Sequence, residues 1–396
     1  MTAARRLGVV IAPDSIKGSL AAAEAAVAIA AGLRSAAHGL TLDLLERPVA
    51  DGGEGTVAML LAAGWQPRDR TVPGPTGAPV RATYALSPPG DPVPTAVVEL
   101  ATAAGLGRLP AGPDPLGAST YGVGELVAAA LDDGARRLVL GIGGSASTDG
   151  GAGLAAALGA RFLDDAGRAL APGGGALGLL HRVDASGLDP RLRTVDIVVA
   201  SDVDNPLTGP TGAAHVYGPQ KGATASDVEV LEAGLAQLAA VLRRDLGADV
   251  EHVPGAGAAG GVGAGALALL GARLTPGIDL LLDLVGFDEV VEGKDLVVTG
   301  EGSVDAQTLS GKAPLGVARR AHAAGVPVLV VAGRADLSTA GRAALADLGV
   351  VSVRTLLDIE PHPALAHRDA ARLLADLTAR AFADLVPDLT ISRSPA

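Results

Sequence analysis

Acidic and hydroxyl-bearing residues recur directly after short apolar runs of this sequence, and glycine accompanies them. The fullest example is LVLGIGGSASTDGGAG (138–153), in which the apolar residues 138–140 predict a buried parallel strand and residues 152–158 a helix. Glycine lets backbone approach a ligand closely, and the free N–H groups of a helix N-terminus attract anions. With the hydroxyls and the carboxylate of this loop, the combination suits a phosphate bound beside a metal ion. From this stretch alone, an ordinary strand-to-helix turn is an equally good interpretation.

The same combination follows four other predicted strands. In open α/β sheets, ligands bind outside the carboxyl ends of the strands. Acids there could hold Mg²⁺, which takes one or two carboxylates beside substrate phosphates. Any single Asp is better explained as a turn or capping residue, but five similar strand ends favour an enzyme that uses Mg²⁺ and phosphate. The residues of this pattern are Asp14, Ser15, Lys17, Asp51, Glu54, Ser145, Asp149, Asp202, Asp204, Asn205, Glu301, Asp305 and Lys312, with Lys221 as a further lysine beside glycine.

Two other functions are left open by the motifs. Gly255, Gly257 and Gly260 have the dinucleotide-binding spacing, and Asp279 lies near the distance expected of a ribose-binding acid. The residues before them predict only a weak strand and Pro254 adjoins the first glycine, so an NAD-dependent hydroxy-acid dehydrogenase is an alternative and not the main hypothesis. A non-catalytic protein that binds sugar acids or phosphate is the other alternative. No GxxxxGK[ST] sequence occurs, which argues against a P-loop nucleotide site.

The composition limits the classes of partner that the protein can be expected to bind. A net charge of −12 gives no long-range attraction to nucleic acid or to an anionic membrane. The absence of cysteine excludes disulfides and thiolate chemistry. No apolar run is long enough to span a membrane without glycine or charge, and the N-terminus does not have the pattern of a signal peptide. We therefore expect a cytoplasmic protein with neither a nucleic-acid nor a membrane partner.

The predicted elements that must position these residues form two domains. Strands at 8–12 and 42–49 alternate with helices at 20–37 and 57–63, which is typical of a parallel sheet. A proline-rich stretch at 67–99 then favours edge strands and turns, and the βαβ rhythm returns at 283–333. We predict a doubly wound domain from residues 1–65 and 285–396, with residues 66–284 inserted. Further expectations are a capping box at Ser226–Glu229, a strand at 350–354 and a helix at 363–385, the segment 334–396 having a structural role.

These motifs resemble those of the type 1 family of bacterial glycerate kinases, in the order of that family from residue 11 to about residue 333. The sequence departs from the family pattern at Ile16, Ser147, Ser201 and Ser303, and the last change removes a possible cation from the loop of Glu301. The matching stretches are IAPDSIKGSL (11–20), PVADGGEGT (48–56), STYGVGEL (119–126), GIGGSASTDGGAG (141–153), SDVDNPLTGPTGAA (201–214), YGPQKGA (217–223), PGAGAAGGVGAG (254–265) and GEGSVDAQTLSGKAPLGVA (300–318).

The resemblance implies an activity and an architecture. The expected reaction is ATP-dependent phosphorylation of D-glycerate with Mg²⁺ in the cytoplasm. The product is 2-phosphoglycerate in most members and 3-phosphoglycerate in others. The implied fold is a Rossmann- or flavodoxin-like parallel-sheet domain formed by both chain ends, with an inserted mixed α/β domain and the active-site cleft between the two. A monomer or homodimer is expected.

We assign roles to the strand-end residues as hypotheses. Lys17 and Lys312 are predicted catalytic cations that face the glycerate carboxylate or the transferring phosphate, and Asp202 is the predicted base for the attacking hydroxyl. Asp14, Asp149 and Asp305 are the alternatives for the base. Each acid could instead be a helix N-cap, whose loss costs about 0.5–2 kcal/mol. Predicted contacts to substrate or phosphate are Asp14, Ser15, Gly144, Ser145, Lys221 and Asn205, and predicted metal ligands are Asp149, Asp204, Glu301 and Asp305.

Overall fold

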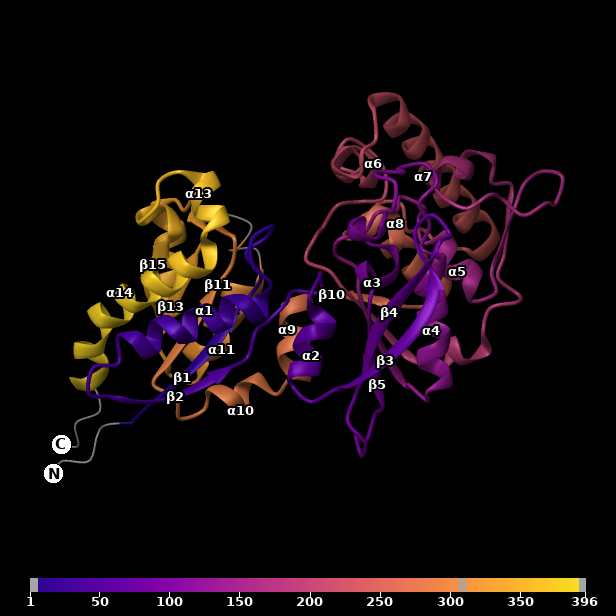
Figure 1. Cartoon of the computed structure of the whole chain (residues 1–396). Coiled ribbons are helices and arrows are strands. Elements are labelled where there is room, and N and C mark those ends of the chain that lie inside the picture. Colours follow the sequence, from indigo (N-terminus) through magenta and orange to yellow (C-terminus); the bar gives the residue numbers. More distant parts are fainter. Residues whose placement is uncertain (1–5, 306–307, 309–310, 392–396) are drawn as a thin grey trace. The chain divides into compact units, whose positions relative to one another are not determined.

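The structure is a computed structural model of the chain that describes residues 6–305, 308 and 311–391 (Figure 1). Its contacts divide the chain into a terminal unit, Met1–Asp51 with Ile278–Ala396, and an inserted unit, Gly52–Gly277. The sequence placed these boundaries at residues 65 and 285. Helix α2 (Thr56–Ala62) belongs to the inserted unit because the backbone N–H of Val57 donates to the Glu99 carboxylate of that unit (3.0 Å).

The terminal unit is built on a sheet of five parallel strands in the order β2-β1-β11-β13-β15. Counted along this unit, the order is 2-1-3-4-5, the flavodoxin-like arrangement, which confirms the predicted doubly wound α/β fold. The chain direction across the sheet reverses between β1 and β11, so the switch point of the sheet lies at their carboxyl ends. The strands are β1 (Arg6–Pro13), β2 (Thr41–Glu46), β11 (Leu296–Gly300), β13 (Val328–Ala332) and β15 (Val350–Thr355).

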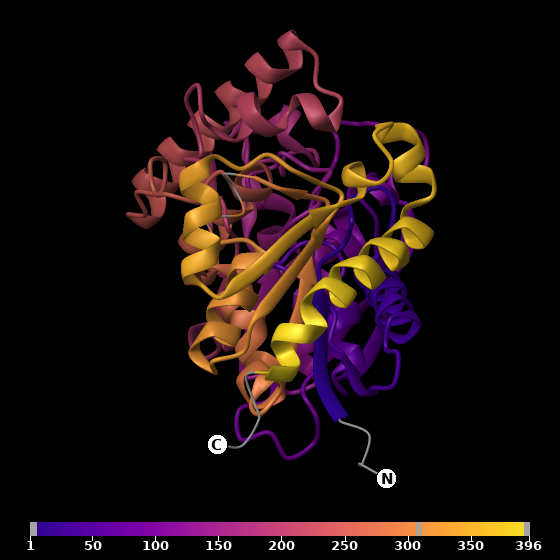
Figure 2. The same ribbon diagram turned by 90° about the vertical axis from the view of Figure 1, so that its left-hand side faces the viewer.

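Helices cover both faces of this sheet, and Figure 2 shows the yellow helix α14 on one side of the strands and orange helices on the other. Helices α1 and α14 pack closely at Gly32, which has no side chain to keep them apart. A Cβ on Gly32 would lie 2.3 Å from the carbonyl oxygen of Ala375. The predicted helix at 363–385 is two helices, α13 and α14. The smaller strands β12 (Ser303–Val304) and β14 (Arg334–Ala335) pair just beyond β11 and β13. The helices are α1 (Ala22–Ser35), α9 (Gly277–Leu284), α10 (Phe287–Val291), α11 (Ala313–Ala323), α12 (Thr339–Asp347), α13 (Pro363–Arg368) and α14 (Ala370–Ile391), with the short 3₁₀ helix η7 (Leu356–Asp358).

The inserted unit has a mixed six-stranded sheet in the order β10-β9-β6-β5-β4-β3. Strands β10, β9, β6 and β5 are parallel, whereas β4 and β3 run antiparallel to their neighbours. Strand β3 was not predicted, and its two prolines, Pro67 and Pro73, fit its place at the sheet edge. The strands are β3 (Gln66–Pro73), β4 (Pro79–Leu86), β5 (Thr95–Glu99), β6 (Arg137–Gly141), β9 (Asp196–Ala200) and β10 (Arg273–Thr275), with the hairpin β7 (Arg161–Leu163) and β8 (Arg182–Asp184) apart from the sheet.

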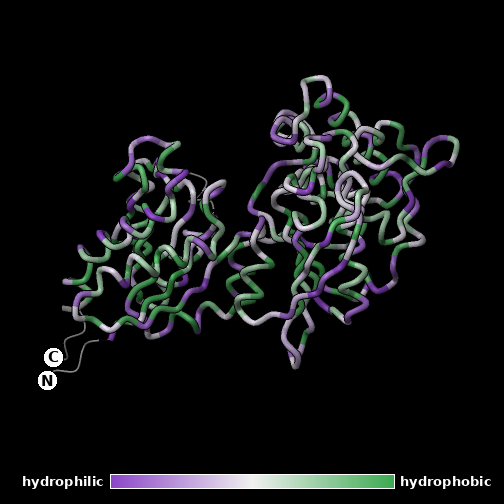
Figure 3. The backbone as a smooth tube through the Cα atoms, in the orientation of Figure 1, coloured by the Kyte–Doolittle hydropathy of each residue, from purple (hydrophilic) through white to green (hydrophobic). Residues whose placement is uncertain are grey.

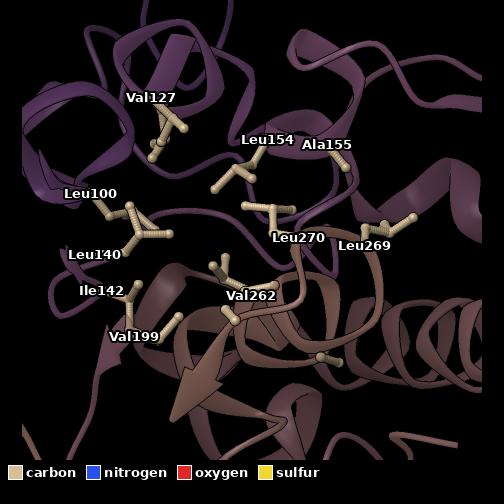
Figure 4. Packing of buried hydrophobic residues seen from close by; sticks show 14 of the residues in the cluster. Leu100, Val127, Leu140, Ile142, Leu154, Ala155, Val199, Val262, Leu269 and Leu270 are labelled. Carbon is tan, nitrogen blue, oxygen red and sulfur yellow. The ribbon is translucent and has the colours of Figure 1, made fainter. Parts of the chain in front are cut away.

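The helices of the inserted unit bury an aliphatic core with few aromatic residues, in which Leu140, Leu154 and Val262 lie together (Figure 4). In Figure 3 the hydrophobic stretches gather inside each unit. The predicted capping box lies two residues too late: Thr224 caps α7 and Asp227 completes the box. No helix among the described residues is long and apolar enough to cross a membrane. The helices are α2, α3 (Ala101–Ala104), α4 (Tyr121–Asp132), α5 (Ala152–Ala157), α6 (Ala213–Tyr217), α7 (Ala225–Leu246) and α8 (Ala258–Gly265), with the shorter η1 (Leu106–Arg108), η2 (Gly174–Leu179), η3 (Pro190–Arg193), η4 (Pro219–Lys221) and the π-helix η5 (Ala266–Leu270).

Candidate active site

A cavity of about 350 Å³ lies in the terminal unit at the carboxyl ends of β1 and β11. The topology places it there, because loops that leave the two strands at a switch point diverge and leave a space. It brings together six residues that the sequence singled out: Asp14, Ser15, Lys17, Asp51, Glu301 and Lys312. Its other lining residues are Ile16, Ser19, Gly302, Ser303, Gly333, Arg334, Leu356, Leu357, Pro363, Ala366 and His367.

A tight turn after β1 presents Lys17. The backbone N–H of Ile16 donates to the carbonyl of Leu20 (2.9 Å), and the N–H of Leu20 donates back to the carbonyl of Ile16 (3.0 Å). Ile16 is buried and anchors the turn, whereas Lys17 is exposed. Gly18 has a φ of +79°, which a residue with a side chain rarely adopts. The sequence therefore fixes the backbone of the turn and leaves the ammonium at its tip able to meet a ligand.

Asp14, Asp51 and Glu301 share the cavity, and two of them, Asp14 and Glu301, have raised pKa values. Burial raises the pKa of Asp14 to about 7, with the charges of Asp51 and Glu301 adding to the effect. Burial also raises the pKa of Glu301 to about 7, against the lowering effects of the Thr308 hydroxyl and the Lys312 ammonium. Carboxylates held in this way fit a divalent cation, which would relieve their repulsion. No group of three or more His, Asp or Glu residues is arranged to hold a metal within the described part of the chain. Asp14 and Glu301 are therefore the residues of this cavity that could hold a divalent cation together with substrate oxygens.

Two further cations line the same cavity. Lys312 is the N-cap residue of α11, and its side chain makes no capping hydrogen bond, so the first N–H groups of the helix and the lysine side chain belong to the same end of α11. The Nε of Arg334 donates to Ser303 Oγ (3.1 Å), which in turn donates to the carboxylate of Asp305 (3.1 Å). A guanidinium thus lies beside position 303, where the sequence had lost a cation. Asp305, a predicted metal ligand, does not line the cavity.

One part of the cavity lining, the apolar wall, comes from the segment that was expected to be structural. Leu356 and Leu357 of η7, with Pro363 and Ala366 of α13, form this wall, and His367 stands beside it. A Cβ on Gly18 would lie 2.9 Å from the Nε2 of His367, so α13 reaches the turn of Lys17. Sequence reasoning missed these residues because their apolar side chains have no chemical signature. Arg334 could have been found, since it follows β13 as the other candidates follow their strands.

In the inserted unit, Lys221 is buried beneath the loop of residues 145–149. Its ammonium donates to Ser145 Oγ (2.8 Å) and to the carbonyl of Ser147, and only 2% of the residue is exposed. Burial lowers the pKa of Lys221 to about 7, with the charge of Asp149 opposing the shift. A Cβ on Gly260 would lie 2.9 Å from the lysine Nζ, so the loop before the main part of α8 encloses it. This enclosure favours a structural role for Lys221 over the predicted phosphate contact.

Asp149 organises the same loop from a fully buried position. Its carboxylate accepts bonds from the N–H and hydroxyl of Thr120 (both 2.8 Å) and from the backbone N–H groups of Gly151 (3.1 Å) and Gly153 (3.2 Å). A carboxylate with four protein donors is typical of a structural centre. The arrangement therefore favours a structural role over the predicted metal role, and also over the alternative of Asp149 as the base.

Asp149→Asn is expected to lower the free energy of unfolding of the inserted unit by about 2–3 kcal/mol. The charge-assisted hydrogen bonds to the carboxylate are lost, and the new amide NH2 group, itself a donor, faces donors whose bonds the carboxylate oxygen had accepted. Urea denaturation followed by circular dichroism measures the effect. Asp204→Asn, at an exposed acid, is the control and should change stability little. An Asp149→Asn protein of unchanged stability that had lost its Mg²⁺ dependence would restore the metal assignment.

The loop after β9 carries the remaining candidates. The carboxylate of Asp202 accepts a bond from the N–H of Gly277 (2.8 Å), and Asp204 is exposed. Asn205 donates to the carbonyl of Thr211 (2.7 Å) and accepts from the hydroxyl of Tyr217 (2.6 Å), so both ends of its amide hold the loop. These bonds favour a structural role for Asn205 over the predicted substrate contact.

Two glycine loops of the inserted unit differ in what they support. Gly144 has a φ of +73°, and its carbonyl accepts the N–H of Leu106 (3.1 Å). Gly255 and Gly260 do not form a dinucleotide fingerprint, because the described element directly before them is helix α7 and not a strand, and residues 259–261 have positive φ. Asp279, the expected ribose ligand, is paired with Arg319 (2.8 Å). The dehydrogenase hypothesis therefore loses its structural basis.

Asp14→Asn is expected to stabilise the protein near pH 8, in EDTA, by about 1–2 kcal/mol after allowance for solvent screening. The folded-state pKa of about 7 exceeds the ordinary value of 3.8, so the folded state binds more protons between these pH values. The free energy of unfolding therefore falls as pH rises from about 4 to about 7, and above pH 7 the ionised Asp14 destabilises the folded state to the full extent. Asparagine removes that destabilisation, so the difference between the two proteins should vanish below about pH 4. Equal stability of both at pH 8 would contradict the origin given for the pKa shift.

Comparison with known proteins places this geometry in a family. The model of the glycerate kinase family matches residues 9–386. The chain is 50% identical over 327 residues to the glycerate kinase of Bacillus subtilis (strain 168), covering 82% of this chain and 84% of that protein. It is 46% identical to the glycerate 2-kinase of Escherichia coli (strain K12), with coverage of 82% and 84%. A solved structure from Salmonella typhimurium LT2, assigned as a glycerate kinase 2, superposes with a TM-score of 0.79 at 41% identity, covering 98% of this chain and all of that one.

Proposed function

The chain belongs to the glycerate kinase family, and from that premise we propose that it transfers the γ-phosphoryl group of ATP to the 2-hydroxyl of D-glycerate. The products are 2-phosphoglycerate and ADP. The observation that carries the proposal is the cavity at the β1–β11 switch point, in which cations and carboxylates meet. The choice of the 2-hydroxyl is supported by the 46% identity to a relative named glycerate 2-kinase.

In the proposed reaction the 2-hydroxyl oxygen attacks the γ-phosphorus, the bond from that phosphorus to the bridging oxygen breaks, and ADP leaves. The protein supplies positioning and charge, because phosphoryl transfer needs little covalent chemistry from the enzyme. Lys17 and Lys312 bind the transferring phosphoryl oxygens. A bound Mg²⁺, held by Asp14 and Glu301, would neutralise phosphate charge.

Asp202 is the proposed base that accepts the proton of the 2-hydroxyl. The bond from the N–H of Gly277 holds one carboxylate oxygen in a fixed place. Asp149 is the weaker candidate, since its oxygens already accept four protein bonds. Asp14 is the second candidate for the base, because a pKa of about 7 matches the needs of proton transfer near neutral pH.

The remaining sequence predictions stay proposals of narrower scope. Ser15 lines the cavity and is proposed to donate its hydroxyl to a phosphate oxygen. Gly144, Ser145 and Asp204 remain proposed contacts of the substrate or the metal. A cytoplasmic location and a monomeric or homodimeric state also remain predictions from the sequence.

Incubation of the purified protein with ATP, Mg²⁺ and D-glycerate tests the function. We expect release of ADP and direct conversion of the product by enolase. Conversion only after addition of a phosphoglycerate mutase would indicate 3-phosphoglycerate. Ligand binding without ADP release would support the non-catalytic alternative, and formation of NADH from NAD would revive the dehydrogenase.

A further inference from the structure

The cavity of the terminal unit combines two kinds of surface. Its lining includes three cations, Lys17, Lys312 and Arg334, and an apolar part formed by residues of η7 and α13. We infer that this cavity is the nucleotide site and that the apolar wall, residues Leu356, Leu357, Pro363 and Ala366, binds the purine base. The inference rests on the proposed use of ATP and adds to it the unit and the side chains that select the nucleotide.

The apolar wall has no partner in D-glycerate. Each of the three carbons of glycerate carries oxygen, so the substrate offers almost no apolar surface to bury. A purine ring offers two apolar faces, and their burial against aliphatic side chains is favourable. The cavity of about 350 Å³ also falls within the usual range for sites of drug-sized ligands. The volume and the wall both fit a nucleotide better than a three-carbon acid.

The wall is available for a ligand. Leu356 and Ala366 are buried and fix its base, whereas Leu357 is half-buried and Pro363 is exposed. Because η7 and α13 both pack on the core beneath α14, the wall is part of the folded unit. A base could therefore bind to it without rearrangement of the sheet.

The cationic part of the lining suits the phosphates. Lys17 stands at the tip of its turn, and Lys312 marks the uncapped N-terminus of the 11-residue helix α11. Helix N-termini attract phosphate through their free N–H groups, and the lysine adds a full charge. The switch point of a sheet with this strand order is where ligands are expected to bind.

A second cavity, in the inserted unit, is less suitable. Its guanidinium, Arg191, is already paired with Asp189 (2.7 Å) and with Asp132 (2.8 Å). A phosphate would have to displace both carboxylates. The charges therefore favour the terminal-unit cavity.

Leu357→Ala tests the inference by removing apolar contact without touching a charged group. We expect the KM for ATP to rise about tenfold, as for the loss of much of a buried leucine side chain, while the KM for D-glycerate and kcat change less than twofold. The Kd of Mg²⁺–ADP, from calorimetry without glycerate, should rise by a similar factor. Leu365→Ala is the matched control, since Leu365 is half-buried on the neighbouring helix α13 but does not line the cavity. A rise in the KM for D-glycerate alone would overturn the inference.

Hydrogen exchange of the wild-type protein gives a test that needs no variant. Saturation with Mg²⁺–ADP should slow exchange in peptides covering residues 14–20 and 354–368. Slowed exchange confined to the inserted unit would overturn the inference. If the wild-type protein binds ADP with this pattern but does not phosphorylate glycerate, the proposed reaction fails and the nucleotide site stands. If it phosphorylates glycerate while Leu357→Ala leaves the KM and Kd unchanged, the site fails and the reaction stands.

Discussion

Lys17→Met is expected to lower kcat/KM for D-glycerate phosphorylation about 10³-fold, the upper end of the loss seen when one preorganised donor to a transition state is removed. Its ammonium stands exposed at the tip of a turn whose backbone bonds do not involve the side chain. Methionine keeps the length of the side chain and removes only the charge. Steady-state kinetics at saturating Mg²⁺ would show the loss mainly in kcat if the contact forms with the transferring phosphoryl group.

Lys294→Met is the control for this substitution. Lys294 lies in the same unit, is paired with Asp43 (3.8 Å) and does not line the cavity. Its replacement should leave kcat/KM within about twofold of wild type, because the half-buried ion pair does not contact the cavity. Near-normal kinetics for Lys17→Met, with a thermal unfolding midpoint equal to that of wild type, would remove Lys17 from the site.

Asp202→Asn is expected to lower kcat by about 10²–10⁴-fold, the usual contribution of a general base. Asparagine keeps an oxygen that can accept the bond from the N–H of Gly277 but cannot take a proton at neutral pH. The effect should therefore appear in kcat, with binding of ATP little changed. Stopped-flow or coupled assays across pH 5–9 measure kcat and the affinity for ATP.

Asp249→Asn is the control for the base, since Asp249 is exposed and paired with Arg243 on the inserted unit. It should retain full activity. An active Asp202→Asn enzyme would remove Asp202 from the role of the base. Loss of activity in Asp202→Asn together with a lower unfolding midpoint would indicate a capping role instead.

Much of the fold could be predicted because its signals are local. Apolar runs followed by Gly or by an acidic residue mark the strands β1, β6, β9 and β11. Strand β3 was missed because an edge strand tolerates the prolines that argue against a strand elsewhere. The helix at 363–385 was predicted as one because its break at Asp369 carries no Gly or Pro.

The site was only partly predictable, because the sequence signals are local and the site depends on which residues the fold brings together. Asp14, Lys17, Glu301 and Lys312 follow strands of one sheet, so the strand-end rule alone suggested their proximity. Whether a residue is buried cannot be deduced from a local sequence motif. Lys221 and Asp149 sit in glycine-rich loops like the cavity residues do, yet the fold encloses both.

The apolar wall was beyond prediction from the sequence. Leu357 and Ala366 come from short elements about 340 residues after the turn of Lys17 in the chain, and they have the composition of ordinary core residues. The parallel pairing of β1 with β11, of β11 with β13 and of β13 with β15 brings them to the carboxyl end of β1. Long-range pairing of this kind leaves no mark on the local sequence.

A proton-coupled ³¹P spectrum of a reaction with ATP, Mg²⁺ and D-glycerate tests the central proposal most directly. A phosphate on C2 is coupled to one carbon-bound proton and one on C3 to two, so the spectrum reports both transfer and position. We expect a new doublet to grow together with the resonances of ADP. A triplet would show phosphorylation of the 3-hydroxyl, and the absence of any new phosphomonoester resonance would contradict the kinase activity proposed for this chain.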